Sequence, residues 1–439
     1  MNQMMIGSKP TKSIILETDT DEESSFMGFI KKSQTAGSDG SDPIKKNAIF
    51  MMCIINDHYV IGACIAAYCH RKMLIRAGLK DTTDLVIMCD EKIYDKYHEV
   101  LNNPELFDIV IKIKIRIFPD AAQYNYSKIK YSSWIGASLN KWQIMDHDEY
   151  ERIMFVDIAL LPNDPKLYDL FKIKVPAVVV REKLSQKSDK HTYKCTDGQD
   201  IKHKRRSDIT YDEYLANYET YGTIHGYLVV IEPNKNMYKQ YVEMTDDIYK
   251  SGIYSIYGSG PDETSLFYFF LNMGMMVHNI CHENATVPWD EQILIDISKG
   301  YEFSSMFKPW IKPKILCWPE ELLWRDVYDI LVKRIVKNDP ESYKVLNLLF
   351  KKTIIETYDR YIVSDNKAQH KNYNNKFVNQ YRKEFDNIKT ISLRSNPSGL
   401  RSNPSSRQDD IFDALMLLDS KIHVKFYGQL KTQRLTELL

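Results

Sequence analysis

The hydrophobic pattern becomes regular near residue 47, where unbroken apolar runs begin to alternate with stretches of helical spacing. Helical spacing over residues 59–77 ends at Gly78, a common stop signal, and a second helix is predicted from about residue 93. Short apolar runs bounded by polar residues are typical of strands buried on both faces. Three such runs occupy residues 48–55, 84–89 and 109–117. Strands that alternate with helices in this way predict a parallel sheet joined by right-handed crossovers.

The same alternation continues through the middle of the chain. Strands are predicted at residues 152–157, 175–180 and 227–231. Helices are predicted over residues 131–145, from about 234 and from about 264. The whole pattern indicates an α/β fold with a Rossmann-like, mostly parallel sheet flanked by helices. Sheets of this kind bind ligands at the carboxyl ends of their strands.

Composition divides the chain into five stretches. Residues 1–46 lack hydrophobic periodicity and cluster Gly, Ser and Asp, which predicts a flexible or disordered tail. The α/β pattern occupies residues 47–324, and Lys- and Asn-rich helices are expected to form an extension over residues 325–393. Residues 394–409 contain a repeated Leu-Arg-Ser-Asn-Pro-Ser unit and predict a low-complexity linker, and residues 410–439 form a last amphipathic segment.

A polar, basic stretch over residues 185–214 interrupts the α/β pattern and includes Lys202-His203-Lys204-Arg205-Arg206. It is either a solvated surface loop or a loop that binds an acidic or extended acceptor. Over the whole chain, 59 Lys and Arg balance 59 Asp and Glu. No overall field therefore attracts nucleic acid or an anionic membrane, and neither is expected as a partner.

The beginning of the chain and the cysteines bear on the compartment. The first 46 residues lack the basic start and apolar run of a secretory signal, and no uncharged apolar run of roughly 18 residues predicts a membrane span. The seven cysteines are odd in number, which favours free buried thiols in a reducing compartment over disulfides. A cytoplasmic location is expected.

Short polar motifs stand where the predicted strands end and the predicted helices begin. They are Asn56-Asp57-His58-Tyr59 with Gly62-Ala63, Leu139-Asn140-Lys141-Trp142, Asp157-Ile158-Ala159, His225-Gly226, Gly260-Pro261-Asp262-Glu263 and Phe307-Lys308-Pro309-Trp310. Each has an ordinary structural interpretation, because Asn and Asp cap helices, lysines are solvated on helix surfaces and a lone histidine is most often a polar turn residue.

Taken together and in this order, the motifs resemble those of glycosyltransferase family 8, the glycogenin-like enzymes, over about residues 47–324. The resemblance implies a GT-A type fold and a retaining transfer of a hexose from a UDP-sugar, UDP-glucose-like, to a hydroxyl acceptor. It also implies a divalent cofactor, Mn²⁺ or Mg²⁺. In this family the acceptor attacks from the face that the diphosphate leaves, with a phosphate oxygen as the base, so no protein nucleophile is needed.

The resemblance assigns roles to individual residues. Those at the donor and its phosphates are Asn56, Tyr59, Lys141, Asp157, His225, Gly226 and Lys308. Asp262 contacts the donor sugar or the incoming hydroxyl, and with Lys141 and Glu263 it forms the catalytic set. A lysine at this place neutralises charge that builds on a departing nucleoside diphosphate.

The metal site implied by the resemblance is altered in this sequence. Two aspartates spaced two residues apart on extended backbone face the same way and offer oxygen ligands to a hard divalent cation. Asp157 fits the first position, but Ala159 stands at the second and has no ligand atom. Glu302 replaces the family's histidine six residues before Lys308 and is a candidate oxygen ligand. The site is a natural divergence, an engineered Asp-to-Ala change, or a metal centre held by Asp157 and another donor.

The partners follow from the same resemblance. They are a UDP-sugar donor and a protein, glycan or small-molecule acceptor, and a homodimer stays open. The alternative is a non-catalytic protein that binds a nucleotide sugar or a glycan, because a fold does not guarantee an activity.

Overall fold

The computed structural model describes residues 45–117, 135–181, 197–198, 223–250, 261–286, 298–303, 308–310 and 319–358. The predicted tail up to residue 44, nearly all of the stretch 185–214, the linker 394–409 and the segment 410–439 lie outside these ranges. The fold is therefore that of the unit that begins at Lys45.

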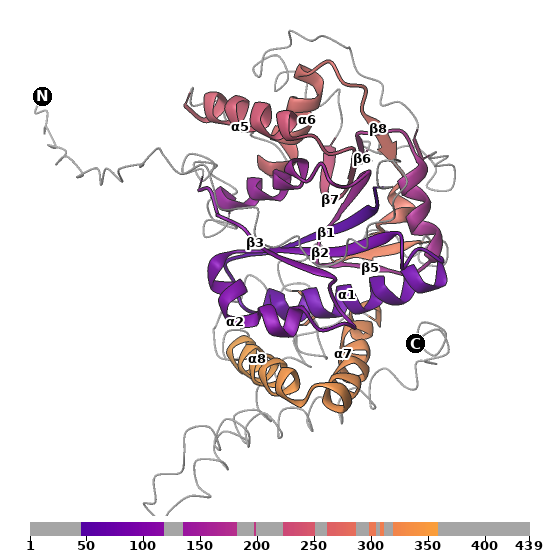
Figure 1. The fold of residues 1–439 in the computed structure, drawn as a ribbon, viewed down its shortest axis with the longest axis vertical. Helices are drawn as coiled ribbons and strands as arrows, with labels where there is room; N and C mark the ends of the chain where they lie inside the picture. The colour runs from indigo at the N-terminus through magenta and orange to yellow at the C-terminus, as the bar shows by residue number, and fades with distance from the viewer. Residues whose placement is uncertain are drawn as a thin grey trace, which may run out of the picture. The chain divides into compact units, whose positions relative to one another are not determined.

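A seven-stranded sheet with the order β3-β2-β1-β4-β7-β6-β8 forms the centre of this unit (Figure 1). Its strands are β1 (Asn47–Cys53), β2 (Thr83–Cys89), β3 (Ile109–Lys112), β4 (Arg152–Val156), β6 (Ala177–Arg181), β7 (Thr223–Ile231) and β8 (His278–Ile280). β1 is parallel to β2 and β4, whereas β7 is antiparallel to both β4 and β6. The mostly parallel sheet predicted from the sequence is confirmed. β7 itself was predicted as a strand, but its reversed direction was not, because apolar periodicity carries no information on strand direction.

A two-stranded ribbon adds a second, smaller sheet. β5 (Leu160–Pro162) follows β4 after a short turn and pairs antiparallel with β9 (Gly300–Glu302). Neither strand was predicted, because three residues are too few to show a period. The ribbon lies directly after Asp157, so it fixes the chain beyond the carboxyl end of β4.

Helices cover both faces of the large sheet. Alternate residues of β1 therefore pack into two separate apolar cores. Ile49 and Met51 pack into one core, and Ala48 and Phe50 into the other. The first core is covered by α1 (Tyr59–Arg76), α2 (Glu91–Leu101), the 3₁₀ helix η3 (Pro165–Lys172), α7 (Pro319–Asn338) and α8 (Pro340–Tyr358). The second is covered by the 3₁₀ helix η2 (Ile135–Asp146), α5 (Lys235–Lys250) and α6 (Pro261–Asn272).

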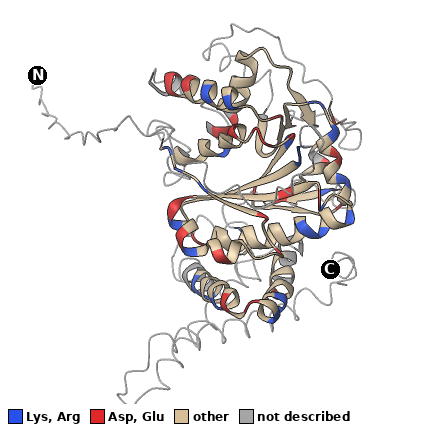
Figure 2. Cartoon of the chain, in the orientation of Figure 1, with Lys and Arg blue, Asp and Glu red and all other residues tan. Residues whose placement is uncertain are grey.

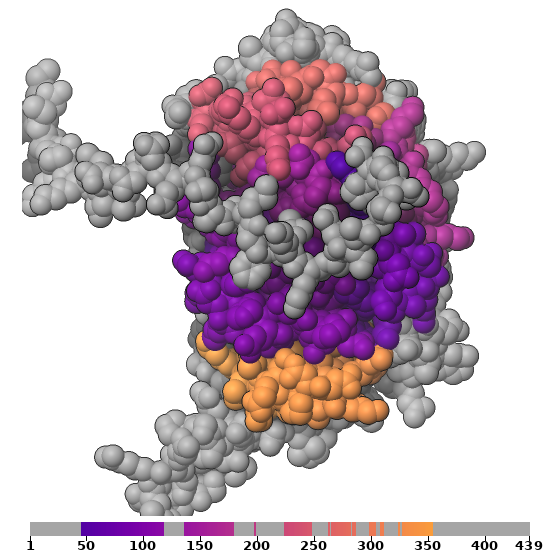
Figure 3. Space-filling view, viewed as in Figure 1, coloured from indigo at the N-terminus to yellow at the C-terminus, as the bar shows by residue number. Residues whose placement is uncertain are grey.

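The C-terminal helices α7 and α8 belong to the first core. Trp324, Leu331 and Phe350 are buried there with residues of α1 and α2. Arg334 donates a hydrogen bond of 3.0 Å to the hydroxyl of Tyr68 on α1. In Figure 3 the two orange helices form a layer against the indigo and violet helices. Helical structure after residue 324 is confirmed, and α7 already begins at Pro319.

The helices carry charges of both signs. On α5 the basic residues Lys235 and Lys239 precede the acidic residues Glu243, Asp246 and Asp247, whereas on α8 Glu341 precedes Lys344, Lys351 and Lys352 (Figure 2). Their ion pairs include Lys344 with Glu341 on α8, at 2.5 Å between side chains that are both exposed. No helix in the described part of the chain is long and apolar enough to cross a bilayer.

The cysteines divide into two kinds. Cys53, Cys64 and Cys89 are free and buried, and Cys69 is free and half-buried. Burial raises the pKa of the Cys64 thiol to about 12, so this thiol stays protonated and unreactive. Cys281 is disulfide-bonded, so the expectation of free thiols is wrong for this residue. The odd count of seven allowed a disulfide, and pairing depends on tertiary proximity that spacing does not reveal.

Acid should destabilise the fold through His70. This histidine is fully buried on α1, with Nδ1 3.1 Å from the Tyr168 hydroxyl, and burial lowers its pKa to about 3. Below a pH of about 6.5 the unfolded chain binds a proton that folded His70 refuses, so stability falls by about 1.4 kcal/mol per pH unit. Urea denaturation at pH 6.5 and 5 measures this loss as about 2 kcal/mol. His70→Gln should lack this part of the slope, and equal slopes in both proteins would contradict the prediction.

Candidate functional site

The predicted site residues stand at the carboxyl edge of the sheet. Asp157 directly follows β4, and its N–H donates to the carbonyl of Tyr227 on β7 at 2.8 Å. The pairing of β7 with β6 shifts register there, from Val178 opposite Val229 to Val179 opposite His225. The bulge takes Gly226 out of the regular ladder, and bulges often re-aim the chain beside functional sites. His225 stacks on Tyr227 with ring centroids 4.9 Å apart.

A buried ion pair joins two of the predicted catalytic residues. Lys141 lies on η2, and its Nζ is 2.7 Å from Oδ2 of Asp262 in the first turn of α6. The Lys141 side chain is 13% exposed and that of Asp262 is 4% exposed. The indole Nε1 of Trp142 donates to the main-chain carbonyl of Asp262 at 3.0 Å and fixes the start of α6 against η2. The pair is therefore held by neighbours on both sides.

Because position 226 is a glycine, β7 can approach the pair of Lys141 and Asp262. The N–H of Gly226 donates to Oε1 of Glu263 at 2.8 Å. A Cβ at this position would lie 2.9 Å from Cγ of Glu263 and 3.5 Å from both Oδ2 of Asp262 and the Trp142 ring. The absent side chain therefore lets Glu263 and the Asp262 carboxylate pack closely against the main chain of β7.

The site is rich in negative charge. Burial alone would lower the pKa of Lys141, but the carboxylates of Asp262, Asp157 and Glu263 outweigh it and raise this pKa. Lys141 is therefore a permanent cation at physiological pH. Ionisable groups perturbed by burial and specific partners gather preferentially at functional sites.

The loop after β1 and the segment 308–310 form a second part of the predicted site. Gly62 on α1 faces Trp310, whose ring is fully buried, and Tyr59 lies edge-on to the same ring at 5.8 Å between centroids. Two predicted motifs almost 250 residues apart, by their positions in the sequence, thus meet. Lys308 donates from Nζ to the carbonyl of Phe303 at 3.0 Å, beside β9.

Gly62→Ala should destabilise this junction. The added Cβ would lie 2.6–2.8 Å from three ring atoms of Trp310, well inside ordinary carbon contact distances. Overpacking of this kind costs about 1–3 kcal/mol, which we expect as a lower melting temperature. Gly62→Ala combined with Trp310→Phe should recover part of the loss, because the smaller ring relieves the collision. An unchanged melting temperature in Gly62→Ala would show that Trp310 has room to move.

Residues 157–159 form a turn and not the extended backbone expected from the sequence. Oδ1 of Asp157 accepts a hydrogen bond of 2.9 Å from the N–H of Ala159. The main-chain carbonyl of Asp157 accepts another of 2.9 Å from the N–H of Leu160. The side chain of an aspartate that bonds the backbone two residues on stabilises such a turn. Ala159 is fully buried in the first core, and its N–H is the group that the Asp157 carboxylate binds.

The predicted metal site lacks the second aspartate of a two-aspartate centre. Glu302 is buried on β9, where it pairs with Leu160 across the ribbon. Ala159 offers no oxygen from its side chain, and Asp157 uses one carboxylate oxygen for the turn. Among the described residues no group of three or more His, Cys, Asp or Glu side chains could hold a metal ion.

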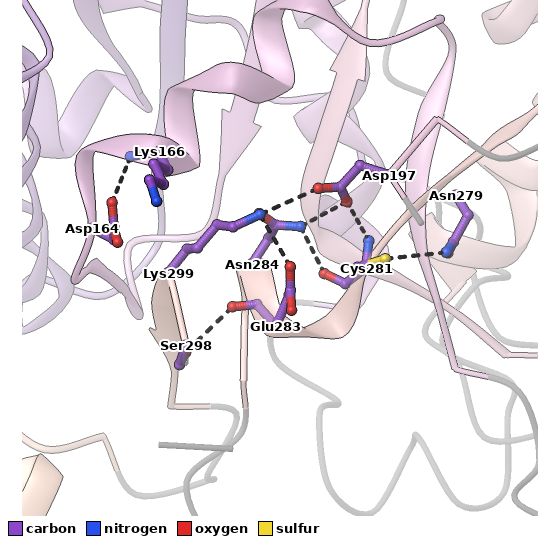
Figure 4. A network of polar contacts seen from close by, with 9 residues as sticks. All are labelled: Asp164, Lys166, Asp197, Asn279, Cys281, Glu283, Asn284, Ser298 and Lys299. Atoms are coloured by element: carbon purple, nitrogen blue, oxygen red, sulfur yellow. Dashed lines mark hydrogen bonds and ion pairs between the residues drawn. The ribbon is translucent and has the colours of Figure 1, made fainter. Parts of the chain in front are cut away.

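A second polar network holds part of the stretch 185–214 at the same edge (Figure 4). Oδ1 of Asp197 accepts hydrogen bonds of 2.8 Å from the N–H of Cys281 and from Nδ2 of Asn284. Lys299 lies 3.3 Å from Asp197 and 3.1 Å from Glu283. Asp197 is thus anchored to the segments after β8 and before β9.

Sequence reasoning missed two contributors to the site. The indole of Trp142 was passed over because its neighbour Lys141 carried the chemical signal. Asp90 directly follows β2 and accepts a hydrogen bond from the N–H of Ile55, in the loop after β1. The signal for Asp90 was present, since it ends an apolar strand just as Asp157 does.

No protein-family model matches the chain, and no curated protein matches it. Similar solved structures include the galactosyltransferase LgtC in complex with donor and acceptor sugar analogs, with 14% identity and a TM-score of 0.40 over 64% of this chain and 95% of that chain. The apo form of the glycosyltransferase GlyE of Streptococcus pneumoniae TIGR4 has 11% identity and a TM-score of 0.39 over 71% and 64%. Mouse xyloside xylosyltransferase 1 in its apo form has 13% identity and a TM-score of 0.32 over 59% and 98%. Likeness at this level leaves function to be argued from the site residues.

Proposed function

We propose that this chain binds a uridine diphosphate sugar at the carboxyl edge of its sheet and transfers the hexose to a hydroxyl acceptor with retention of configuration. The observation that carries the proposal is the buried pair of Lys141 and Asp262, 2.7 Å long and formed by residues 121 positions apart. Buried ion pairs are weak stabilisers compared with apolar packing, so stability alone is a poor reason for one. Its place at the ligand-binding edge of an α/β sheet supports a functional role.

In the proposed reaction each side chain has a distinct task. Lys141 neutralises the negative charge that develops on the departing diphosphate. Asp262 accepts a hydrogen bond from a hydroxyl of the donor sugar or of the acceptor, and Glu263 holds the main chain at Gly226 beside it. Attack from the face that the diphosphate leaves makes a phosphate oxygen the base.

The nucleotide end of the donor is assigned to the loop after β1. Asn56 and the ring of Tyr59 hold the ribose and the uracil, and Lys308 supplies a further positive charge for the phosphates. His225 lines the sugar side of the pocket. The tasks are assigned to side chains and not to Mn²⁺ or Mg²⁺, because Ala159 leaves the two-aspartate cation site without its second ligand.

A second candidate is a protein that binds a nucleotide sugar or a glycan without turnover. One observation favours it: Ala159 is buried in the apolar core, and the carboxylate of Asp157 is hydrogen-bonded within its own turn. A chain of this kind would keep the binding residues of the loop after β1 and lack a normal cation site.

Binding and turnover separate the two functions. Calorimetric titration with UDP, and an assay of UDP-hexose hydrolysis with Mn²⁺ and with a chelator, are made on the wild type, on Lys141→Met and on the surface control Lys172→Met. A transferase binds UDP and hydrolyses the donor, and only Lys141→Met loses hydrolysis. Binding without hydrolysis under either condition supports the non-catalytic protein. A wild-type chain that binds no UDP with or without Mn²⁺ would overturn both.

A further inference from the structure

The loop between β1 and α1 contains a backbone conformation that β-branched residues rarely adopt. Ile55 has a φ of +71°, in the left-handed region. The N–H of Asn56 donates to the carbonyl of Ile54 at 2.8 Å, which closes a γ-turn around Ile55. A γ-turn with positive φ at its centre is rare and strained, and a β-branched residue there is an outlier. Such strain persists only where surrounding contacts over-determine it, and it clusters at binding sites.

The contact that holds this turn comes from the neighbouring strand and helix. Asp90 follows β2 and is the N-cap of α2, with a side chain that is nearly buried. Its Oδ1 accepts a hydrogen bond of 2.8 Å from the N–H of Ile93, and its Oδ2 accepts one from the N–H of Ile55. One carboxylate thus satisfies both the start of α2 and the strained turn.

Helix α2 also holds the residue two positions further along the loop. The carboxylate of Asp57 accepts hydrogen bonds of 2.8 Å from Lys96 and 3.0 Å from the hydroxyl of Tyr97. Lys92 lies 3.5 Å from the same carboxylate. The loop is therefore fixed from one side by α2. Asn56 in this loop and Tyr59 at the start of α1 are the residues assigned to the nucleotide.

We propose that Asp90 is a positioning residue for the donor: its carboxylate holds the left-handed turn at Ile55 and so sets where Asn56 and Tyr59 meet the nucleotide. The inference rests on the proposed function, because it names the residue that shapes the nucleotide side of that site. Asp90 itself touches no substrate. Its effect is on the free energy of the binding-competent loop, so it acts on donor affinity and not on the chemical step.

Asp90→Asn tests the proposal without removing the helix cap. Asparagine is as good an N-cap as aspartate, so α2 is retained. The N–H groups of Ile93 and Ile55 bond to different oxygens of Asp90, and in asparagine one of these oxygens is replaced by an NH2 group, which cannot accept from an N–H. We expect the Kd for UDP, measured by calorimetry, to rise about tenfold, as for the loss of one hydrogen bond to a charged group. In the hydrolysis assay, KM should rise while kcat stays near that of the wild type.

A rescue variant distinguishes positioning from a merely structural role. Glycine adopts a positive φ without strain, so Ile55→Gly should keep the turn when the acceptor is lost. The double variant Asp90→Asn with Ile55→Gly is expected to bind UDP within about threefold of the wild type. The matched control Asp95→Asn makes the same chemical change on α2, at a carboxylate that pairs with Lys112 at the surface, and should leave the Kd unchanged.

The outcomes separate this inference from the function on which it rests. A wild-type chain that binds no UDP overturns the proposed function and the inference together. Equal UDP affinity of the wild type and Asp90→Asn overturns the inference alone. A loss of affinity in Asp90→Asn that Ile55→Gly does not restore shows general damage to the fold and also overturns it.

Discussion

Replacing Lys141 with methionine is expected to lower the free energy of unfolding by about 3 to 5 kcal/mol at neutral pH. The change removes the ammonium but leaves the carboxylate of Asp262, whose side chain is 4% exposed, without its partner. Asp157 and Glu263 add two further negative charges close to the same point. The protein therefore loses more than the pair itself contributes, because an uncompensated charge stays buried.

Denaturation by urea at pH 7 measures the loss, and a second variant separates stability from function. In Lys141→Met with Asp262→Leu no charge of the pair is left buried, so most of the stability should return. Hydrolysis of the UDP-sugar should stay lower by about two to three orders of magnitude in both proteins, because the cation that stabilises the departing diphosphate is gone. Lys172→Met, which removes half of an exposed pair with Asp169, should change stability by less than about 1 kcal/mol. Equal stability of the wild type and Lys141→Met would contradict the buried pair.

Introducing aspartate at position 159 is expected to destabilise the protein by several kcal/mol and not to restore a metal site. Ala159 is fully buried in the first core, and its carbonyl accepts a hydrogen bond of 3.1 Å from the N–H of Phe303. A carboxylate in this place loses its hydration without gaining a partner, which costs about 3 kcal/mol or more.

The pH dependence of Ala159→Asp distinguishes a buried charge from crowding. Burial raises the pKa of such a carboxyl in the folded state, so the loss of stability is largest at neutral pH and shrinks as the pH falls towards about 4. Ala159→Asn has the same size without a charge, so its loss should not vary with pH in this way. Thermal melts at pH 7 and pH 4.5 give both differences. A different result would place residue 159 beside a cation. In that case Ala159→Asp melts at the temperature of the wild type, and added Mn²⁺ raises the melting temperature of this variant alone.

Much of the site was predictable because its motifs lie at element boundaries that local patterns reveal. Lys141 on a helix, Asp157 at the end of a strand and Asp262 at the start of a helix were each placed correctly from apolar periodicity and capping preferences. Because parallel strands end at one edge, a sheet built from these elements brings such residues together. In the structure Lys141 meets Asp262, and Gly226 meets Glu263.

Contacts between distant segments were not predictable in the same way. The collision-free fit of Gly62 against Trp310 and the hydrogen bond from Ile55 to Asp90 depend on how separate elements pack. The expectation of extended backbone at Ala159 is wrong, because the side chain of Asp157 accepts a hydrogen bond from the N–H of Ala159 and so stabilises a turn. Local sequence gave no means of choosing between a strand and that turn.

The sequence by itself determined the α/β class, the positions of β1, β2, β3, β4, β6 and β7 along the chain and the residues with the chemistry to handle a charged ligand. Those properties follow from periodicity, capping and residue type, which act over a few neighbouring positions. Only the tertiary structure decided that β7 runs antiparallel, that Ala159 is buried in the first core and that Asp90 holds the turn at Ile55. These depend on contacts between residues far apart in the chain, whose free energies are set by the packing of whole elements.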